Sequence, residues 1–249
     1  MKVESRIRLG LVFAFAGTIE LFCRTAIIPH SVMIPPSEMV VELVSILGRG
    51  EMTADIASTF ANVAISTLIV VVLGFVVGLA IHAVPWLRTA VEPLLASYYS
   101  VPTFMFYPVF IVLFGVGRAP IIAIAVLLAI VAMITATLNG LDRIPTVLRK
   151  TARIHRMSRV ATAFLIELPA TAPYLFTGVK LAVAYSFIGV IASEFILSGS
   201  GLGYEIAYAY NNFENRKMYA LMLLVLASVT VVNSILNAVD NRLQARQRR

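Results

Sequence analysis

The chain has 249 residues, of which 59% are hydrophobic and 13% charged, and it carries a net charge of +7 and a single cysteine. A soluble domain has about 45–50% apolar and about 25% charged residues, so this composition excludes a compact soluble enzyme, a disordered protein and a disulfide-rich secreted module. An integral membrane protein fits, and in such a protein the excess of Lys and Arg reports on membrane orientation rather than on a nucleic-acid partner.

Six stretches of about 20 mostly apolar residues are long enough to cross a bilayer as helices. They are Leu9–Pro29, Asn62–Val84, Tyr98–Val116, Ala119–Leu138, Tyr174–Leu197 and Met218–Val239. The first stretch follows basic residues as a signal peptide does, but it is longer than the apolar part of a signal peptide and contains Glu20. We therefore expect it to be retained. The prediction is an all-α polytopic membrane protein with one transmembrane domain over residues 1–249 and a core at about 55–240.

The basic residues predict the orientation of these spans. Fourteen of the 20 Lys and Arg residues lie in segments 1–8, 85–97, 139–173 and 240–249, all on the same side if the chain crosses six times. Four lie on the opposite side, and two lie within spans. Because cytoplasmic loops of membrane proteins are enriched in Lys and Arg, both termini are predicted to be cytoplasmic.

Ionisable residues within the apolar spans are candidates for function, since each costs several kcal/mol when it faces lipid. In the first span, Glu20 and Arg24 are four residues apart, which indicates an ion pair within the helix. After this span, Ser37 is expected to cap a short amphipathic helix at the outer membrane surface. The apolar stripe predicted for this helix consists of Met39, Val40, Leu43, Val44 and Leu47.

The third span contains two prolines, Pro102 and Pro108, which remove helical hydrogen bonds and predict a kink or a break. Irregular backbone at membrane depth persists where it is buried or lines a water-filled cavity. Both a translocation pathway and a bent packing helix are therefore open interpretations of this span.

The fifth span contains Lys180 and Glu194. Lys180 can reach the cytoplasmic headgroups or contact a transported solute. Glu194 lies roughly 21 Å further along the helix, too far to pair with Lys180, so it needs another partner, water or an outward-facing cavity. The residues that we consider for a translocation pathway are Tyr98, Tyr99, Pro102, Tyr107, Ser186, Ser193 and Glu194.

The sequence shows no pattern for catalysis by this chain. It lacks the GxxxxGK[ST] pattern of a phosphate-binding loop, and Gly199, Gly201 and Gly203 favour a turn after the fifth span over a nucleotide site. None of the three histidines has neighbours at metal-ligand spacing. We expect neither a catalytic residue nor a metal site.

The loop at 139–173 is too long and too patterned for a simple connection. Leu148, Ala152 and His155 recur at helical spacing among basic residues. Such a loop can bind anionic lipid, or it can present a short helix to a soluble partner. The pattern alone leaves both open.

This loop, with the Leu168-Pro169 pair that follows it, resembles the EAA loop of the permease subunits of ATP-binding-cassette importers. The similarity is greatest to the nitrate, sulfonate, taurine and bicarbonate class. Other segments that carry the resemblance are Ile34-Pro35-Pro36-Ser37, Val91-Glu92-Pro93-Leu94, Phe114-Gly115-Val116-Gly117, Gly189-Val190-Ile191-Ala192-Ser193-Glu194-Phe195 and Ser200-Gly201-Leu202-Gly203-Tyr204.

The resemblance implies a permease subunit of the bacterial inner membrane that imports a small anionic or organic nutrient. It implies a coupling helix in loop 139–173 that docks on two separate ATPase subunits, which bind ATP and Mg. It also implies a second permease copy, most simply a homodimer, and an extracytoplasmic substrate-binding protein, with no nucleic acid and no cofactor on this chain. A stand-alone secondary transporter or channel, or a membrane scaffold without transport, is the alternative.

The motif itself departs from the family pattern. The family's Glu-Ala-Ala falls on Lys150-Thr151-Ala152, and its Gly falls on Arg156, which we expect in a backbone conformation that a residue with a Cβ tolerates. The reversed charge at Lys150 implies a more acidic groove on the ATPase. The residues that the resemblance assigns to ATPase coupling are Leu148, Lys150, Thr151, Ala152, Arg153, Arg156, Ser158, Leu168 and Pro169.

Overall fold

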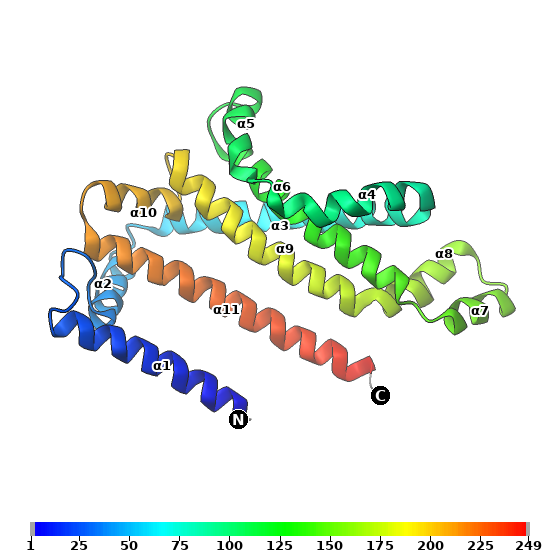
Figure 1. The fold of residues 1–249 in the computed structure, drawn as a ribbon, viewed down its shortest axis with the longest axis horizontal. Coiled ribbons are helices and arrows are strands. Elements are labelled where there is room, and N and C mark those ends of the chain that lie inside the picture. The colour runs from blue at the N-terminus through cyan, green and yellow to red at the C-terminus, as the bar shows by residue number, and fades with distance from the viewer. Residues whose placement is uncertain (1–2, 248–249) are drawn as a thin grey trace. The chain divides into compact units, whose positions relative to one another are not determined.

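The computed structural model describes residues 3–247, and within that range the chain is helical and contains no strand (Figure 1). Its contacts divide the chain into two compact units. The first unit comprises Met1–Ser58 and Glu194–Ser228, and the second comprises Thr59–Ser193 and Val229–Arg249. We describe each unit by itself.

The first unit contains α1 (Val3–Arg24), α2 (Pro36–Arg49) and α10 (Leu202–Asn211), together with the first turns of α3 (Thr53–Ala83) and of α11 (Asn215–Gln247). Its core is a cluster that includes Ile46, Met52, Leu202, Ile206 and Leu221. The Tyr219 hydroxyl donates a hydrogen bond to the Val32 carbonyl at 2.6 Å, which ties α11 to the loop before α2. Helix α2 and the loop before it thus contact segments from the C-terminal part of the chain.

Helix α2 differs from the prediction at its start. It begins at Pro36 with Pro35 in the cap position, because a proline in the first turn loses no helical hydrogen bond. Ser37 lies inside the helix and does not cap it. The buried face is Met39, Leu43 and Ile46, whereas the predicted stripe residues Val40, Val44 and Leu47 are exposed. The exposed face of α2 is therefore apolar.

The second unit contains most of α3, then α4 (Pro85–Ser97), α5 (Tyr107–Phe114), α6 (Arg118–Asp142), α7 (Thr146–Ile154), α8 (Arg159–Thr162) and most of α9 (Leu168–Leu197). Helix α6 is its central element, and Ile124, Ala125 and Ala129 on this helix are fully buried. Helix α3 packs closely on α6 because Gly74 and Gly78 have no side chain there. A Cβ on either glycine would lie 2.7 Å from the side chain of Met133 or Thr137.

Four helical segments in the described range are long and apolar enough to cross a membrane. They are Thr53–Ala83, Arg118–Asp142, Ala163–Ile196 and Asn215–Arg242, and they correspond to the second, fourth, fifth and sixth predicted spans. Helix α1, which covers most of the first predicted span, is not among them. It carries Glu and Arg residues near both of its ends.

The third predicted span is not one helix. The chain bends by 92° between Pro85–Ser100 and Thr103–Phe114, as Figure 1 shows between α4 and α5. The break lies at Val101 and Pro102, which confirms the kink predicted there. Pro108 lies in the first turn of α5, where a proline is tolerated. Helix α5 has eight residues, or roughly 12 Å, and cannot cross a bilayer by itself.

Candidate functional site

Helix α7 occupies the middle of the basic loop that joins α6 to α9. It buries Ala152 against its own chain, with 3% of that residue exposed, and leaves Val147 and Ile154 exposed at 68% and 79%. Lys150 and Arg153 on the same helix are also exposed. The outward surface of α7 therefore combines aliphatic and positively charged side chains, and Ala152 fixes the helix from the opposite side.

Arg149 attaches α7 to both neighbouring helical segments. Its Nε forms an ion pair with Oε1 of Glu167 at 3.4 Å, and its Nη2 donates a hydrogen bond to the Leu141 carbonyl at 3.3 Å. Leu141 lies at the end of α6, and Glu167 lies in the π-helical turn Ala163–Glu167 that leads into α9. Sequence reasoning missed Arg149 because nothing in the pattern distinguishes it from the other basic residues of the loop.

Arg156 ends α7 in a left-handed conformation. Its φ is +48°, in the small allowed region that a residue with a Cβ adopts uncommonly. The Met157 amide donates to the Ala152 carbonyl and the Arg156 amide donates to the Arg153 carbonyl, both at 3.0 Å. These two hydrogen bonds form a Schellman motif, in which the left-handed position usually holds glycine.

The other predicted coupling residues lie around this helix. Leu148 is exposed, and the Thr151 hydroxyl donates back to the Val147 carbonyl at 3.0 Å. Ser158 accepts a hydrogen bond from the Ala161 amide at 3.1 Å at the start of α8. Leu168 and Pro169 begin α9 and are exposed. An apolar cavity of about 240 Å³ beside the π-helical turn is lined in part by Phe75, Phe164 and Leu168.

The predicted pathway residues do not meet at one place. The Tyr98 hydroxyl donates to the Leu127 carbonyl at 2.7 Å, and Tyr107 is buried in the core at 2% exposure. Ser186 and Ser193 are fully buried, and their hydroxyls have no hydrogen-bond partner in the described part of the chain. Pro102 marks the break before α5. Of these residues, Tyr99 lines two cavities.

That cavity has a volume of about 280 Å³ and lies between α6, α9 and the short 3₁₀ turn after α4. Its polar and aromatic lining residues are Tyr99, Thr135, Asn139, Tyr174, Thr177 and Tyr185. A second cavity, of about 350 Å³, shares Tyr99, Thr135 and Asn139 and extends to Arg88 and Glu92. Thr135 and Asn139 are a polar pair four residues apart in an apolar span, a signal that sequence reasoning overlooked.

Glu194 has its partner in the first unit. Its carboxylate is fully buried and accepts a hydrogen bond from the Gly203 amide at 3.2 Å, at the start of α10. Asp55 accepts the neighbouring amide of Gly201 at 2.8 Å. A Cβ on Gly201 would lie 2.5 Å from the Glu194 carboxyl carbon. Carboxylates at a helix N-terminus are stabilised by its free amides and dipole, so the carboxylate of Glu194 holds the start of α10.

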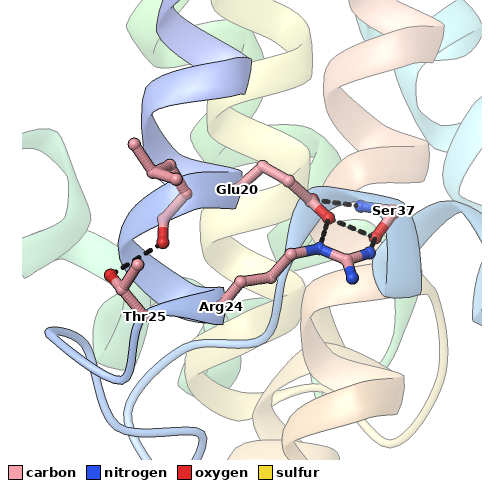
Figure 2. A network of polar contacts seen from close by, with 5 residues as sticks. Glu20, Arg24, Thr25 and Ser37 are labelled. Atoms are coloured by element: carbon pink, nitrogen blue, oxygen red, sulfur yellow. Dashed lines mark hydrogen bonds and ion pairs between the residues drawn. The ribbon is translucent and has the colours of Figure 1, made fainter.

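Two further ion pairs involve the other ionisable residues of the predicted spans. The Lys180 ammonium contacts the Asp240 carboxylate, so in this structure it joins α9 to α11. The predicted ion pair between Arg24 and Glu20 is confirmed, with Nε and Oε1 2.6 Å apart. Figure 2 shows that the Glu20 carboxylate also accepts the Ser37 amide at 3.0 Å and the Ser37 hydroxyl at 2.7 Å. The pair thus links α1 to the first turn of α2.

No cluster of three or more His, Cys, Asp or Glu residues that could hold a metal ion occurs in the part of the chain that the structure describes. The two candidate regions are the cavity lined by Tyr99, which offers hydrogen-bonding groups, and the exposed surface of α7, which is basic and partly apolar. The first can contact a solute, and the second can contact a protein.

The chain is similar to several curated transport proteins. The chain is 29% identical to the nitrate import permease protein NrtB of Leptolyngbya laminosa over 184 residues, which cover 74% of this chain and 64% of that protein. It is 24% identical to the taurine transport system permease protein TauC of Escherichia coli, over 86% of this chain and 78% of that protein. It is 29% identical to the bicarbonate transport system permease protein CmpB of Synechococcus elongatus, over 66% of this chain and 59% of that protein. The chain therefore spans less than two thirds of the length of two of these relatives.

The fold is also that of a solved structure. A chain of the MetNI methionine ABC transporter, described as inward facing, superposes with a TM-score of 0.67 over 77% of this chain and 95% of that chain, at 19% identity. Residues 70–249 match the family described as binding-protein-dependent transport system inner membrane component. This match covers more than half of the sequence and includes α6, α7 and α9. The chain therefore belongs to the family of binding-protein-dependent transport system inner membrane components and is a multi-pass inner-membrane protein.

Proposed function

We propose that the chain is the permease subunit of an ATP-binding-cassette importer that carries a small anionic or organic nutrient, of the nitrate, sulfonate or taurine kind, across the inner membrane. The observation that carries the proposal is the placement of α7. It is a short helix with an exposed aliphatic and basic surface, fixed to the helices on both sides of it by Arg149. Such a helix can receive a force from a separate ATPase and pass it on.

The contacts of Arg149 define the route of that force. When the ATPase subunits close on ATP, their grooves would move α7, and the ion pair to Glu167 would pass the movement to α9. The hydrogen bond to the Leu141 carbonyl would pass it to α6. The spans would then switch between inward-open and outward-open arrangements, a two-state change in which this chain carries out no chemical step.

The exposed basic residues at α7 indicate the chemistry of the ATPase groove that would accept this helix. Lys150, Arg153 and Arg156 are exposed, and α7 contains no acidic residue. The groove that accepts α7 would therefore be acidic with an apolar floor for Val147 and Ile154. The proposed importer also contains two such ATPase subunits, which bind ATP and Mg. It is completed by a second copy of this permease and an extracytoplasmic substrate-binding protein.

The membrane topology belongs to the same proposal. Helix α1 would cross the membrane as the first span, and the bent α4–α5 segment would serve as the third, which makes six spans in one transmembrane domain. Both termini and loop 139–173 would be cytoplasmic, in agreement with the position of most basic residues.

The test is a substitution on the exposed surface of α7. Ile154→Asp places a charge on a side chain that is 79% exposed, so the permease should fold while its apolar contact with the ATPase is lost. Ala152 is unsuitable because it is buried at 3%, and a charge there would disturb the helix itself. We expect the ATPase to co-purify with the wild type and to be lost from the variant.

Phe213→Asp is the matched control. Phe213 is 87% exposed after α10, in the first unit, and its substitution should leave co-purification unchanged. Equal recovery of the ATPase with Ile154→Asp and with the wild type would show that α7 is not the docking helix. Loss of membrane insertion in Ile154→Asp alone would contradict the exposed position of this side chain.

A further inference from the structure

The cavity in the second unit has a polar stripe on one side. Between residues 131 and 141 of α6, Thr135 and Asn139 are exposed, Ala136 is partly exposed and the remaining positions are buried. A hydroxyl and an amide that face hydrocarbon leave donors and acceptors unsatisfied at membrane depth, which costs several kcal/mol. This face of α6 is therefore adapted to water or to a polar solute rather than to lipid.

The other side of the cavity is aromatic. The rings of Tyr99 and Tyr185 stack with centroids 5.5 Å apart and an interplanar angle of 27°. Tyr174 also lines the cavity, and the Arg143 guanidinium carbon lies 5.4 Å from the centre of its ring. None of the residues that line the 280 Å³ cavity in the described chain is Lys, Arg, Asp or Glu. The cavity thus offers ring faces, hydroxyls and one amide, without a charge of its own.

This lining discriminates between classes of nutrient. Inorganic oxyanions such as nitrate are bound most strongly by charged donors, of which the lining has none. Aromatic side chains instead stack on planar rings, and an amide such as that of Asn139 both donates and accepts hydrogen bonds. A volume of about 280 Å³ accommodates a small organic molecule.

We propose that this cavity binds an organic nutrient with a planar aromatic or heteroaromatic ring and hydrogen-bonding groups at the edge of that ring. The stacked Tyr99 and Tyr185 contact the ring, and Asn139 and Thr135 contact its polar edge. The inference rests on the proposed importer function and replaces nitrate, sulfonate or taurine with a planar aromatic nutrient. The adjoining 350 Å³ cavity shares Tyr99, Thr135 and Asn139 and also contains Arg88, whose guanidinium is paired with the Asp142 carboxylate.

The single cysteine makes a chemical test possible. In a Cys23→Ser background, Asn139→Cys introduces a thiol into the cavity, and Val131→Cys introduces one on the same helix at a site that is 3% exposed. A water-soluble methanethiosulfonate should label Asn139→Cys in the full-length permease at least about tenfold faster than Val131→Cys, because only a hydrated thiol ionises and reacts readily. This step tests whether the cavity is open to water.

Protection from labelling then tests the nutrient class. Nicotinamide, 4-hydroxybenzoate and uracil are planar probes, and at least one of them should slow the labelling of Asn139→Cys at least threefold, whereas sodium nitrate and taurine should not. Adding Tyr185→Leu should abolish this protection, while Tyr185→Phe, which keeps the ring, should retain it.

Four results would overturn the inference. The first three are an unreactive Asn139→Cys, equal protection by nitrate or taurine, and protection by none of the planar probes. A disulfide between two copies of Asn139→Cys without aqueous labelling would likewise overturn it, since the face would then be a contact between permeases. ATPase co-purification is measured on the same preparations and depends on α7. If the planar nutrients fail to protect, the proposed importer function still stands. Failure of the importer function would be seen instead as a loss of ATPase co-purification with the wild type.

Discussion

Arg156 shows most clearly how a single residue departs from the pattern of its family. The Schellman motif at the end of α7 requires a left-handed residue, and the resemblance places a glycine there, but this chain has arginine at φ +48°. A residue with a side chain pays about 1 kcal/mol or more for this conformation. The geometry of the loop is therefore kept although the residue suited to it is absent.

Arg156→Gly should consequently stabilise the end of α7. A gain of about 1 kcal/mol corresponds to an approximately fivefold slower exchange of the Met157 amide, which donates to the Ala152 carbonyl. Hydrogen exchange measured by mass spectrometry on the loop peptide checks this. Arg153→Gly is the control, since Arg153 lies within the helix, where glycine costs about 1 kcal/mol and should accelerate exchange. Slower exchange in both variants, or in neither, would contradict the role of the left-handed position.

At the scale of elements, the ion pair of Arg149 with Glu167 joins the candidate docking helix to the π-helical turn before α9. Both side chains are about one third exposed, at 38% and 31%, so the pair adds little to global stability. We expect the ion pair to transmit movement instead, because a docking helix that is not attached to a membrane span cannot move that span. π-Helical turns are often found at functional sites, which agrees with a coupling role for Ala163–Glu167.

The charge-swap pair tests that attachment. Glu167→Arg alone should reduce nutrient uptake severalfold while the ATPase still co-purifies, because docking persists and transmission is lost. The double variant Arg149→Glu with Glu167→Arg restores opposite charges and should recover part of the uptake, because the hydrogen bond from Arg149 to the Leu141 carbonyl is still lost. Glu214→Arg, at an exposed position outside this loop, should behave as the wild type. Uptake unaffected by the single change would exclude the ion pair from the coupling route.

Elements and contacts were predictable from the sequence to different degrees. Hydropathy predicted four spans that the structure confirms, and Pro102 predicted the break before α5, because these depend on local composition and backbone chemistry. The start of α2 was mispredicted at Ser37 because the Pro35-Pro36 pair sets the helix start and the Ser37 hydroxyl donates to Glu20 instead. A cap residue can be recognised locally, but a competing partner 17 residues away cannot.

The candidate site was less accessible to prediction. The carboxylate of Glu194 needed a partner, yet only the folded chain brings the Gly203 amide to it. Tyr99 was identified and Tyr185 was missed, since their stacking joins segments 86 residues apart in a way that no periodicity encodes. At the scale of the molecule, the positive charge that the composition revealed is concentrated on the loop that carries α7. That loop is where we place the energy input.

The most direct test of this placement is nutrient uptake by proteoliposomes that contain the permease, its ATPase and its binding protein. With radiolabelled nicotinamide, 4-hydroxybenzoate, uracil and taurine offered separately, we expect uptake of at least one solute only when the ATPase and ATP are present. We also expect this uptake to be lost in Ile154→Asp and retained in Phe213→Asp. Uptake by the permease alone, or ATP-dependent uptake unchanged by Ile154→Asp, would contradict the claim that α7 couples this chain to a separate ATPase.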